Sequence, residues 1–190
     1  MKKIVGTLAA VAAVAIGATA SATVARFLDL EEHVAASDLV IRARTGEKVE
    51  TFLGADGRPR TETPFHVLQT FKGEARAGSV VRVRQLGGEL PDGGRLVVPG
   101  DAAFAPNEEV VLFLVTDPDG TAFLTAMGQS KYSVRPGPGG PMVERNLDGI
   151  AFYLGGADAK IVPGAAEAPV DLPLFSRAIR DAVTLEGKIE

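Results

Sequence analysis

Apolar and polar residues alternate with a period of two in several short segments of the chain, which is the pattern of half-buried β-strands. The first such segment starts after Asp38 and continues towards Leu53, with Leu39, Ile41 and Ala43 on one face. Gly- and Pro-containing turns separate it from the strands that follow. These later strands are expected at residues 60–71, 79–86, 109–116, 121–127, 131–135 and 142–145.

A different spacing, close to the period of an α-helix, predicts a short helix at each end of this β-rich region. Residues 29–37 begin with Asp29 and Glu32, the arrangement of a capping box. Residues 171–187 carry apolar side chains on one side and charged side chains on the other, and Gly187 is placed to end the helix. The second helix is therefore expected to be amphipathic.

The combined pattern predicts an all-β protein with minor α content. Six to eight short strands with mostly antiparallel connections favour an OB-type small antiparallel β-barrel, flanked by the short N-terminal helix and the C-terminal amphipathic helix. We expect the barrel to span residues 23–154, a linker loop residues 155–170 and the C-terminal helix residues 171–187. The stretch 87–106 is rich in Gly and Pro, and we expect a long loop there with one brief strand around residues 96–98.

Residues 1–22 have the features of a signal peptide. Lys2 and Lys3 precede an uncharged, Ala-rich stretch that ends in two A-x-A sites, at residues 18–20 and 20–22. A permanent membrane anchor is the alternative. With cleavage, the mature chain begins at Ser21 or Thr23 and is secreted or periplasmic, and it meets a membrane only through the signal peptide before cleavage.

Composition excludes several classes of chemistry. The 190 residues include no Cys, which removes disulfides, thiol catalysis and zinc-thiolate sites and favours a bacterial exported protein over a disulfide-rich one. The formal net charge of -4 becomes -6 without Lys2 and Lys3. Nucleic acid is not an expected partner, because its binding depends on clustered Lys and Arg.

No catalytic pattern is present in the sequence. The chain lacks the G-x-S-x-G elbow of serine hydrolases, the P-loop and the dinucleotide-binding glycine pattern. His33 and His66 have no zinc-ligand spacing and are expected to be ordinary surface or strand residues. We therefore expect a protein that is not an enzyme and has no catalytic, cofactor-binding or metal-binding residues.

Arginines at alternate positions of two predicted strands are candidate contacts with a partner. If the strands are neighbours, four guanidinium groups share one outward face and could bind a protein or polyanionic polymer at the cell envelope. The alternative is a solubilised sheet face whose charge is partly neutralised by Glu47 and Glu50. The four residues are Arg42, Arg44, Arg82 and Arg84.

Three segments resemble the netrin-like domain, best known from tissue inhibitors of metalloproteinases. They are ASDLVIRA at residues 36–43, DGRP at 56–59 and VLQTFKG at 67–73. The resemblance covers roughly residues 23–85, and uncharacterised secreted bacterial proteins look similar over a longer span. It implies an OB-type barrel with a helix packed on it.

The resemblance also implies a second function. In the metalloproteinase inhibitors, a mature N-terminal Cys chelates the zinc of the enzyme through its α-amine and carbonyl. Cleavage after Ala22 would place Thr23 at this position, with Val24 and Ala25 as neighbouring contacts. The leading expectation is an exported, non-catalytic β-barrel binding module, and the alternative is a metalloprotease inhibitor that acts through this N-terminus.

Overall fold

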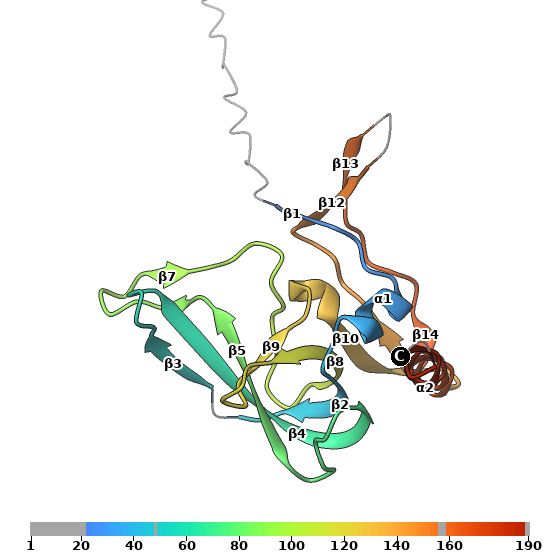
Figure 1. The fold of residues 1–190 in the computed structure, drawn as a ribbon. Coiled ribbons are helices and arrows are strands. Elements are labelled where there is room, and N and C mark those ends of the chain that lie inside the picture. Colours follow the sequence, from blue (N-terminus) through green and yellow to red (C-terminus); the bar gives the residue numbers. More distant parts are fainter. Residues whose placement is uncertain (1–21, 48, 156–158, 189–190) are drawn as a thin grey trace, which may run out of the picture.

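The computed structural model describes residues 22–47, 49–155 and 159–188 (Figure 1). The expected signal peptide lies outside the described residues, apart from Ala22 at its end. Strands dominate the described part of the chain, which also contains one short α-helix and one longer C-terminal α-helix. The predicted all-β class with minor α content is confirmed.

Five strands close into a barrel. If the five strands are numbered along the chain, their order around the barrel is 1-2-3-5-4. Strand 4 pairs with strand 1, and this pairing closes the barrel. The third and fifth strands pair in parallel and the other pairs are antiparallel, which is the OB-type arrangement. The strands are β2 (Leu39–Thr45), β4 (Pro59–Lys72), β5 (Val80–Leu86), β8 (Glu109–Thr116) and β9 (Ala122–Leu124).

The interior of the barrel is filled by the alternate apolar residues that the sequence pattern identified. Leu39, Ile41 and Ala43 of β2 point inward and meet the inward residues of the other four strands. Part of the outer face of β2 and β8 is also buried, because the helices cover Val40, Val111 and Phe113. The central part of β8 is therefore buried on both faces, and the unbroken apolar run in residues 110–115 follows from that.

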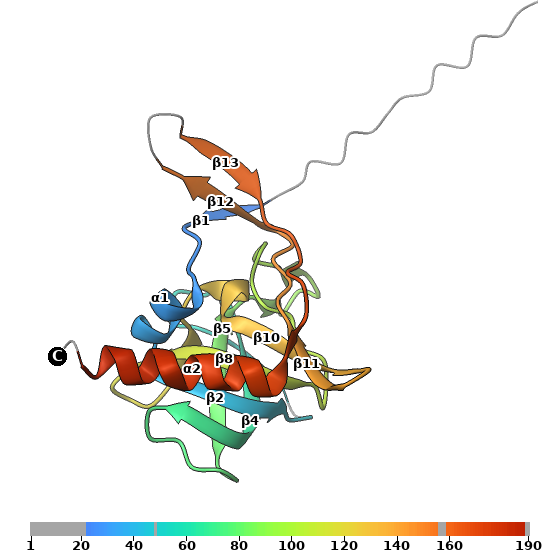
Figure 2. The same ribbon diagram turned by 90° about the vertical axis from the view of Figure 1, so that its right-hand side faces the viewer.

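Both predicted helices form and lie on the same side of the barrel. Helix α1 (Leu30–Ala35) starts with the expected capping box between Asp29 and Glu32. Helix α2 (Leu172–Glu186) ends at Gly187, as predicted. Figure 2 shows α2 crossing in front of β2 and β8. Phe175 and Ile179 of α2 pack in the same cluster as Phe113 of β8.

Several elements extend the barrel. Strands β10 and β11 form a hairpin beside β8, and β14 pairs with β11. A separate three-stranded sheet joins β1 in parallel to β12 and projects away from the barrel (Figures 1 and 2). The bounds are β1 (Thr23–Ala25), the 3-10 helix η1 (Met127–Ser130), β10 (Lys131–Gly137), β11 (Gly140–Glu144), β12 (Ile150–Leu154), β13 (Lys160–Pro163) and β14 (Val170–Asp171).

Three expectations about segments were wrong. The strand expected to run from residue 39 to 53 is interrupted at Gly46, whose N–H donates to Pro64 O, and β3 (Glu50–Leu53) follows as a separate strand. The loop at 87–106 contains two short strands, β6 (Gly88–Glu89) and β7 (Arg95–Leu96). Residues 155–170, expected as a loop, include β13 and the start of β14, because distant strands supply their hydrogen-bonding partners.

Candidate functional site

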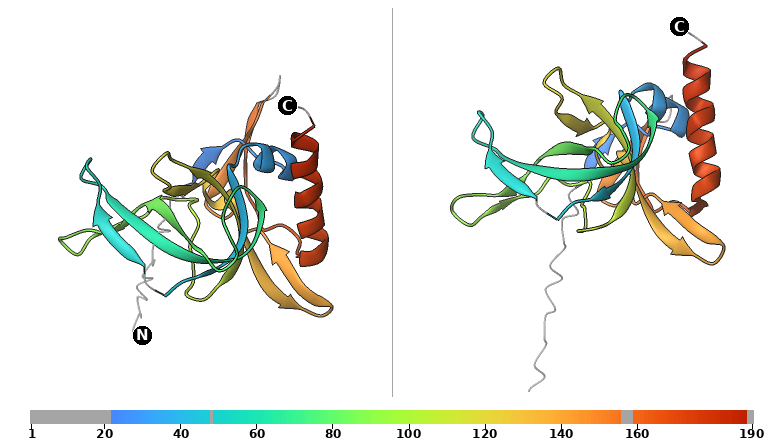
Figure 3. Two further views of the ribbon diagram at one scale, coloured as in Figure 1. Left: turned by 60° about the horizontal axis from the view of Figure 1, so that its bottom comes forward. Right: turned by 90° about the horizontal axis from the view of Figure 1, so that it is seen from below.

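An open cleft of about 290 Å³ lies at one end of the barrel. Strands β4 and β5 extend beyond the barrel here, and the β3–β4 hairpin projects on the side opposite α2 (Figure 3). The loop that connects β7 to β8 crosses the end of the barrel and forms the other wall. The lining comprises Val49, Thr61, Thr63, Gln85, Leu86, Gly87, Gly88, Arg95, Leu96, Val97, Val98, Asp101, Ala102, Ala103 and Phe104.

The loop wall is held in place by side chains of the barrel. Phe104 packs edge-on against the buried Phe65, with 4.9 Å between the ring centroids, and so closes the barrel interior. Gln85 Nε2 donates to Ala102 O at 2.8 Å, and Lys131 Nζ donates to Ala103 O at 2.5 Å. The loop therefore has a defined path, and the cleft is a preformed feature of the fold.

Gly100 allows this loop to approach the β12 strand. Its φ of +78° lies in the left-handed region, and a Cβ at this position would meet Gly149 O at 2.7 Å. In the sequence, the glycines of residues 87–106 indicate a loop. The close approach of two backbones at Gly100 is a further requirement for this one glycine.

The lining of the cleft is rich in hydrogen-bonding groups. Thr61, Thr63 and Gln85 contribute side chains from the inward-facing positions of β4 and β5. Asp101 contributes a carboxyl group whose pKa is raised by burial, although hydrogen bonds from Gln85 and Ala102 oppose that shift. Arg95 is exposed at the rim. This mixture of hydroxyl, amide, carboxyl and guanidinium groups suits a polar ligand.

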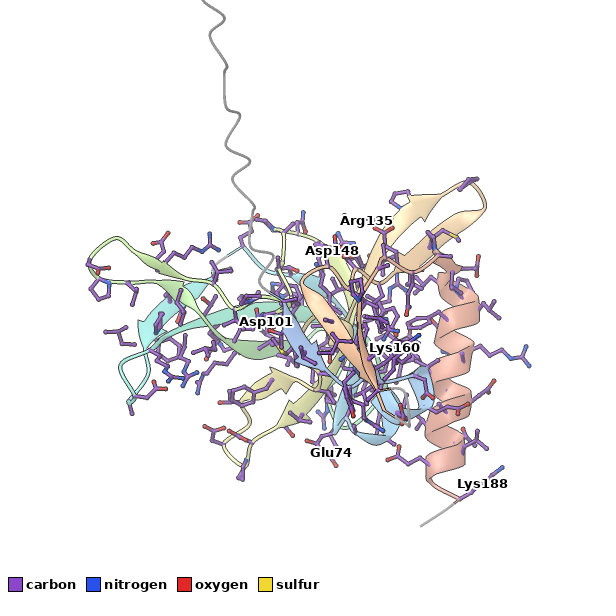
Figure 4. All side chains as sticks on the ribbon, turned by 90° about the horizontal axis from the view of Figure 1, so that it is seen from above. Glu74, Asp101, Arg135, Asp148, Lys160 and Lys188 are labelled. Atoms are coloured by element: carbon purple, nitrogen blue, oxygen red, sulfur yellow. The ribbon has the colours of Figure 1, made fainter. Side chains whose placement is uncertain are left out.

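A second polar cavity, of about 240 Å³, lies behind residues 100–103. Asp101 and Asp148 both line it, and Figure 4 shows them between the β6–β7 arm and the β10–β11 hairpin. Beside it, Lys131 Nζ contacts the buried carboxylate of Glu108 at 2.9 Å. Burial raises the pKa of Glu108, but hydrogen bonds from Lys131, Ser133 and a backbone N–H outweigh it and lower the pKa overall. This ion pair stabilises the residues on which the loop segment 100–103 packs.

The four candidate arginines occupy two separate places on the outside of the barrel. Strands β2 and β5 are not neighbours, because β4 lies between them. Arg42 and Arg44 share the carboxylate of Glu109, at 2.7 Å and 3.1 Å.

Arg82 and Arg84 share the carboxylate of Glu62, at 3.6 Å and 3.0 Å. The carboxylates of these ion pairs are thus Glu109 and Glu62, whereas the sequence analysis named Glu47 and Glu50. Arg84 also lies over the exposed ring of Phe52, 5.3 Å from its centroid. Contact between these arginines and a partner stays a prediction.

The N-terminal arm is ordered by the β1–β12 pairing without any disulfide. Thr23 N donates to Gly149 O at 3.0 Å, and Thr23 Oγ1 donates to Pro99 O at 2.6 Å. Val24 lies opposite Ala151 and is 52% exposed, while Ala25 lies opposite Phe152. An α-amino group at Thr23 would have to leave Gly149 O before it could chelate zinc. Inhibition through this terminus stays a prediction.

The prediction for His33 was wrong. It belongs to α1 and is fully buried, with Nε2 3.1 Å from Ser130 Oγ and its ring against Phe113. Burial, with the nearby charge of Arg145, lowers the pKa of His33 to about 4. His66 is exposed on the outer face of β4, opposite Arg44, as expected. A single histidine on a six-residue helix gives no pattern from which its burial could be inferred.

Arg145, which directly follows β11, is a second buried polar residue that the sequence pattern did not indicate. It sits at a polar position next to a turn, which is typical of an exposed residue, yet its side chain is only 3% exposed. Its guanidinium lies between the rings of Phe27 and Tyr132, 5.0 Å and 5.1 Å from their centroids. Only the three-dimensional packing of the N-terminal arm on β10 and β11 encloses it.

Across residues 22–47, 49–155 and 159–188, no group of three or more His, Asp or Glu side chains could hold a metal ion. None of the helices in these ranges has the length and apolar character needed to cross a bilayer. No family model, curated protein or solved structure matches the chain.

Proposed function

We propose that this chain is an exported, non-catalytic binding module that takes a saccharide unit of a cell-envelope polymer into the cleft at the mouth of the barrel. The observation that carries the proposal is the concave, preformed cleft of about 290 Å³ with hydrogen-bonding side chains on both walls. Barrel mouths are common positions for binding sites, and OB-type barrels bind oligosaccharides as well as oligonucleotides.

The chemistry of the lining favours a sugar over an apolar ligand. Thr61, Thr63 and Gln85 present hydroxyl and amide groups, and the loop wall adds Asp101. Sugar hydroxyl groups both donate and accept hydrogen bonds, so they match such a mixed set. Apolar side chains of Leu96 and Val98 complete the lining and can contact the C–H face of a ring.

The acidic composition supports a sugar rather than a nucleic acid as the occupant. Without its expected signal peptide the chain carries a net charge of -6, which opposes the approach of a phosphate backbone. Arg95 supplies a cation at the rim, and this suits a neutral or singly acidic sugar.

Binding of soluble envelope oligosaccharides to the mature protein, followed by NMR chemical shifts and calorimetry, tests the proposal. The probes are peptidoglycan disaccharide fragments, which carry one carboxylate on each disaccharide. We expect shifts at Thr61, Gln85 and Asp101, and no cleavage of the probe. Arg95→Ala should weaken binding roughly tenfold, as expected for loss of a charge-assisted hydrogen bond.

Matched variants separate the cleft from the rest of the surface. Arg76→Ala removes an exposed arginine from the β4–β5 connection, far along these strands from the cleft, and should leave binding unchanged. Arg82→Ala with Arg84→Ala removes the pair on the outer face of β5. If only this double variant lowers affinity, the ligand binds the outer face and the cleft proposal is wrong. The absence of shifts with every probe would also contradict it.

A further inference from the structure

A third cavity, on the other side of the molecule, has a more apolar lining than the cleft at the barrel mouth. It measures about 230 Å³ and lies between α1, the start of α2, the β10–β11 hairpin and the segment that leads into β14. It shares no residue with the cleft at the barrel mouth. Most of its lining is apolar or aromatic: Phe27, Leu30, Tyr132, Val143, Ala168, Val170 and Phe175, with Asp29, Arg145 and Glu167 as the charged members.

Arg145 is a buried cation in the wall of this cavity. One terminal nitrogen, Nη1, donates to Leu28 O at 3.3 Å, and the other, Nη2, pairs with the carboxylate of Glu167. The Nε atom is buried and has no hydrogen-bond partner. An unsatisfied buried donor of a charged group is costly, so the geometry leaves this guanidinium incompletely paired.

The missing hydrogen bond defines what would complete the site. A guanidinium presents Nε and Nη2 side by side, and a carboxylate placed in line with both accepts two parallel hydrogen bonds. Glu167 uses only Nη2. A carboxylate that approaches from the cavity could use both nitrogens and satisfy the donor that Glu167 leaves unpaired.

Glu167 is also placed so that it could yield to such a ligand. Its side chain is 38% exposed, and it belongs to the segment 164–169, which has no regular secondary structure between β13 and β14. Its backbone N–H donates to Arg145 O at 3.0 Å, so the segment can stay attached while the side chain turns outward. Solvent would then hydrate the displaced carboxylate, which lowers the cost of the exchange.

We propose that this cavity binds a small monocarboxylic acid with an apolar body, whose carboxylate replaces that of Glu167 on Nε and Nη2 of Arg145. The rings of Phe27, Tyr132 and Phe175 surround the apolar body. The carboxylate of Asp29, which caps α1 at the rim of the cavity, disfavours ligands with a second negative charge.

Phenylacetate is the probe that tests this proposal, with phenylacetamide and phenethylamine as neutral and cationic controls. The chain has two Tyr and no Trp, so Tyr153→Phe leaves Tyr132 as the reporter of ring contacts by fluorescence and NMR. We expect phenylacetate to bind and perturb Tyr132, and both controls to bind at least tenfold more weakly. Glu167→Gln, which removes the competing carboxylate, should raise the affinity for phenylacetate at least tenfold.

Two results would overturn the proposal. The first is no perturbation of Tyr132 by millimolar phenylacetate in either the parent or Glu167→Gln. The second is equal binding of phenylacetate and phenylacetamide, because the guanidinium would then make no distinction by charge. Arg145→Gln should abolish the preference for phenylacetate, and the Glu167→Gln measurement decides the matter if the Arg145 variant does not fold.

Discussion

At the residue scale, His33 is the side chain whose environment differs most from its sequence context. It follows Glu31 and Glu32 in the chain, but its ring lies fully buried between Phe113 and Ser130. Burial favours the neutral imidazole, and this is why its pKa falls from 6.5 to about 4. The unfolded chain takes up a proton on this residue at a higher pH than the folded protein does.

This difference predicts a loss of stability in mild acid. Between pH 6.5 and about 4 the unfolded state binds a proton at His33 that the folded state excludes, so the free energy of unfolding falls as the pH decreases. The full effect is on the order of 3 kcal/mol. Chemical denaturation at a series of pH values should show that His33→Gln flattens this part of the profile.

The exposed His66 provides the control for this measurement. His66→Gln should keep the slope of the parent protein between pH 6.5 and 4. Glu108, whose pKa is lowered, and Asp101, whose pKa is raised, add slopes of opposite sign at the acid end, but both remain in every variant and cancel in the comparison. Parallel profiles for the parent and His33→Gln would show that burial of His33 does not control acid stability.

At the scale of elements, the sequence pattern predicted those segments that carry either an unbroken apolar run or a one-sided apolar face. The run 109–116 forms β8 with the expected bounds, and α2 differs from its prediction by one residue at each end. Elements that depend on a distant partner were missed. Strand β12 is five residues long and is the central strand of the sheet that it forms with β1 and β13. No local pattern indicated that the N-terminal arm would pair with it.

The candidate sites were less predictable than the fold for the same reason. Periodicity gave the outward position of Arg82 and Arg84 correctly, but not that β4 would separate them from Arg42 and Arg44. The cleft joins β4 and β5 to a loop that starts after β7, and it exists because Phe104 folds back onto Phe65. The spacing of residues along the sequence carries no information about a contact between segments this far apart.

Helix α2 provides a stability prediction at this scale. Ile179 faces the barrel and is fully buried, whereas Leu174, five residues earlier, is 61% exposed. Ile179→Ala should lower the free energy of unfolding by about 2–5 kcal/mol, because it leaves a cavity between the helix and the outer face of β2 and β8. Leu174→Ala should change it by less than about 0.5 kcal/mol.

Urea denaturation of the two variants measures this difference directly. A large loss for Ile179→Ala with an unchanged dependence on denaturant means that α2 is docked in the native protein. Equal small effects for Ile179→Ala and Leu174→Ala would mean that the helix contributes little to the folded state in solution.

At the scale of the whole molecule, two hydrophobic clusters share the same two strands. Val40 and Phe113 belong to the cluster under the helices, while Ile41 and Leu112, their neighbours in the chain, belong to the barrel interior. Loss of either cluster therefore removes support from the other. The three-stranded sheet of β1, β12 and β13 has a small cluster of its own around Leu147, Ile150 and Phe152.

This arrangement predicts two levels of protection against hydrogen exchange. The backbone amides of β2 and β8 should exchange only through global unfolding. The amides of β13, whose Ile161 is 59% exposed, should exchange through local opening, roughly a hundredfold faster or more. Native-state exchange followed by NMR checks this order, and equal protection of β8 and β13 would show that the projecting sheet unfolds together with the barrel.

The pairing of β1 with β12 has a consequence for how accessible the start of the domain is to a peptidase. A peptidase binds the residues on both sides of its scissile bond in an extended form, and here Thr23 is already bonded to Gly149 and Pro99. In the folded domain, the N–H and hydroxyl groups of Thr23 are therefore already engaged by other backbone carbonyls. If residues 1–22 are a leader that is cut after Ala22, we expect cleavage to be faster before the domain folds than after it.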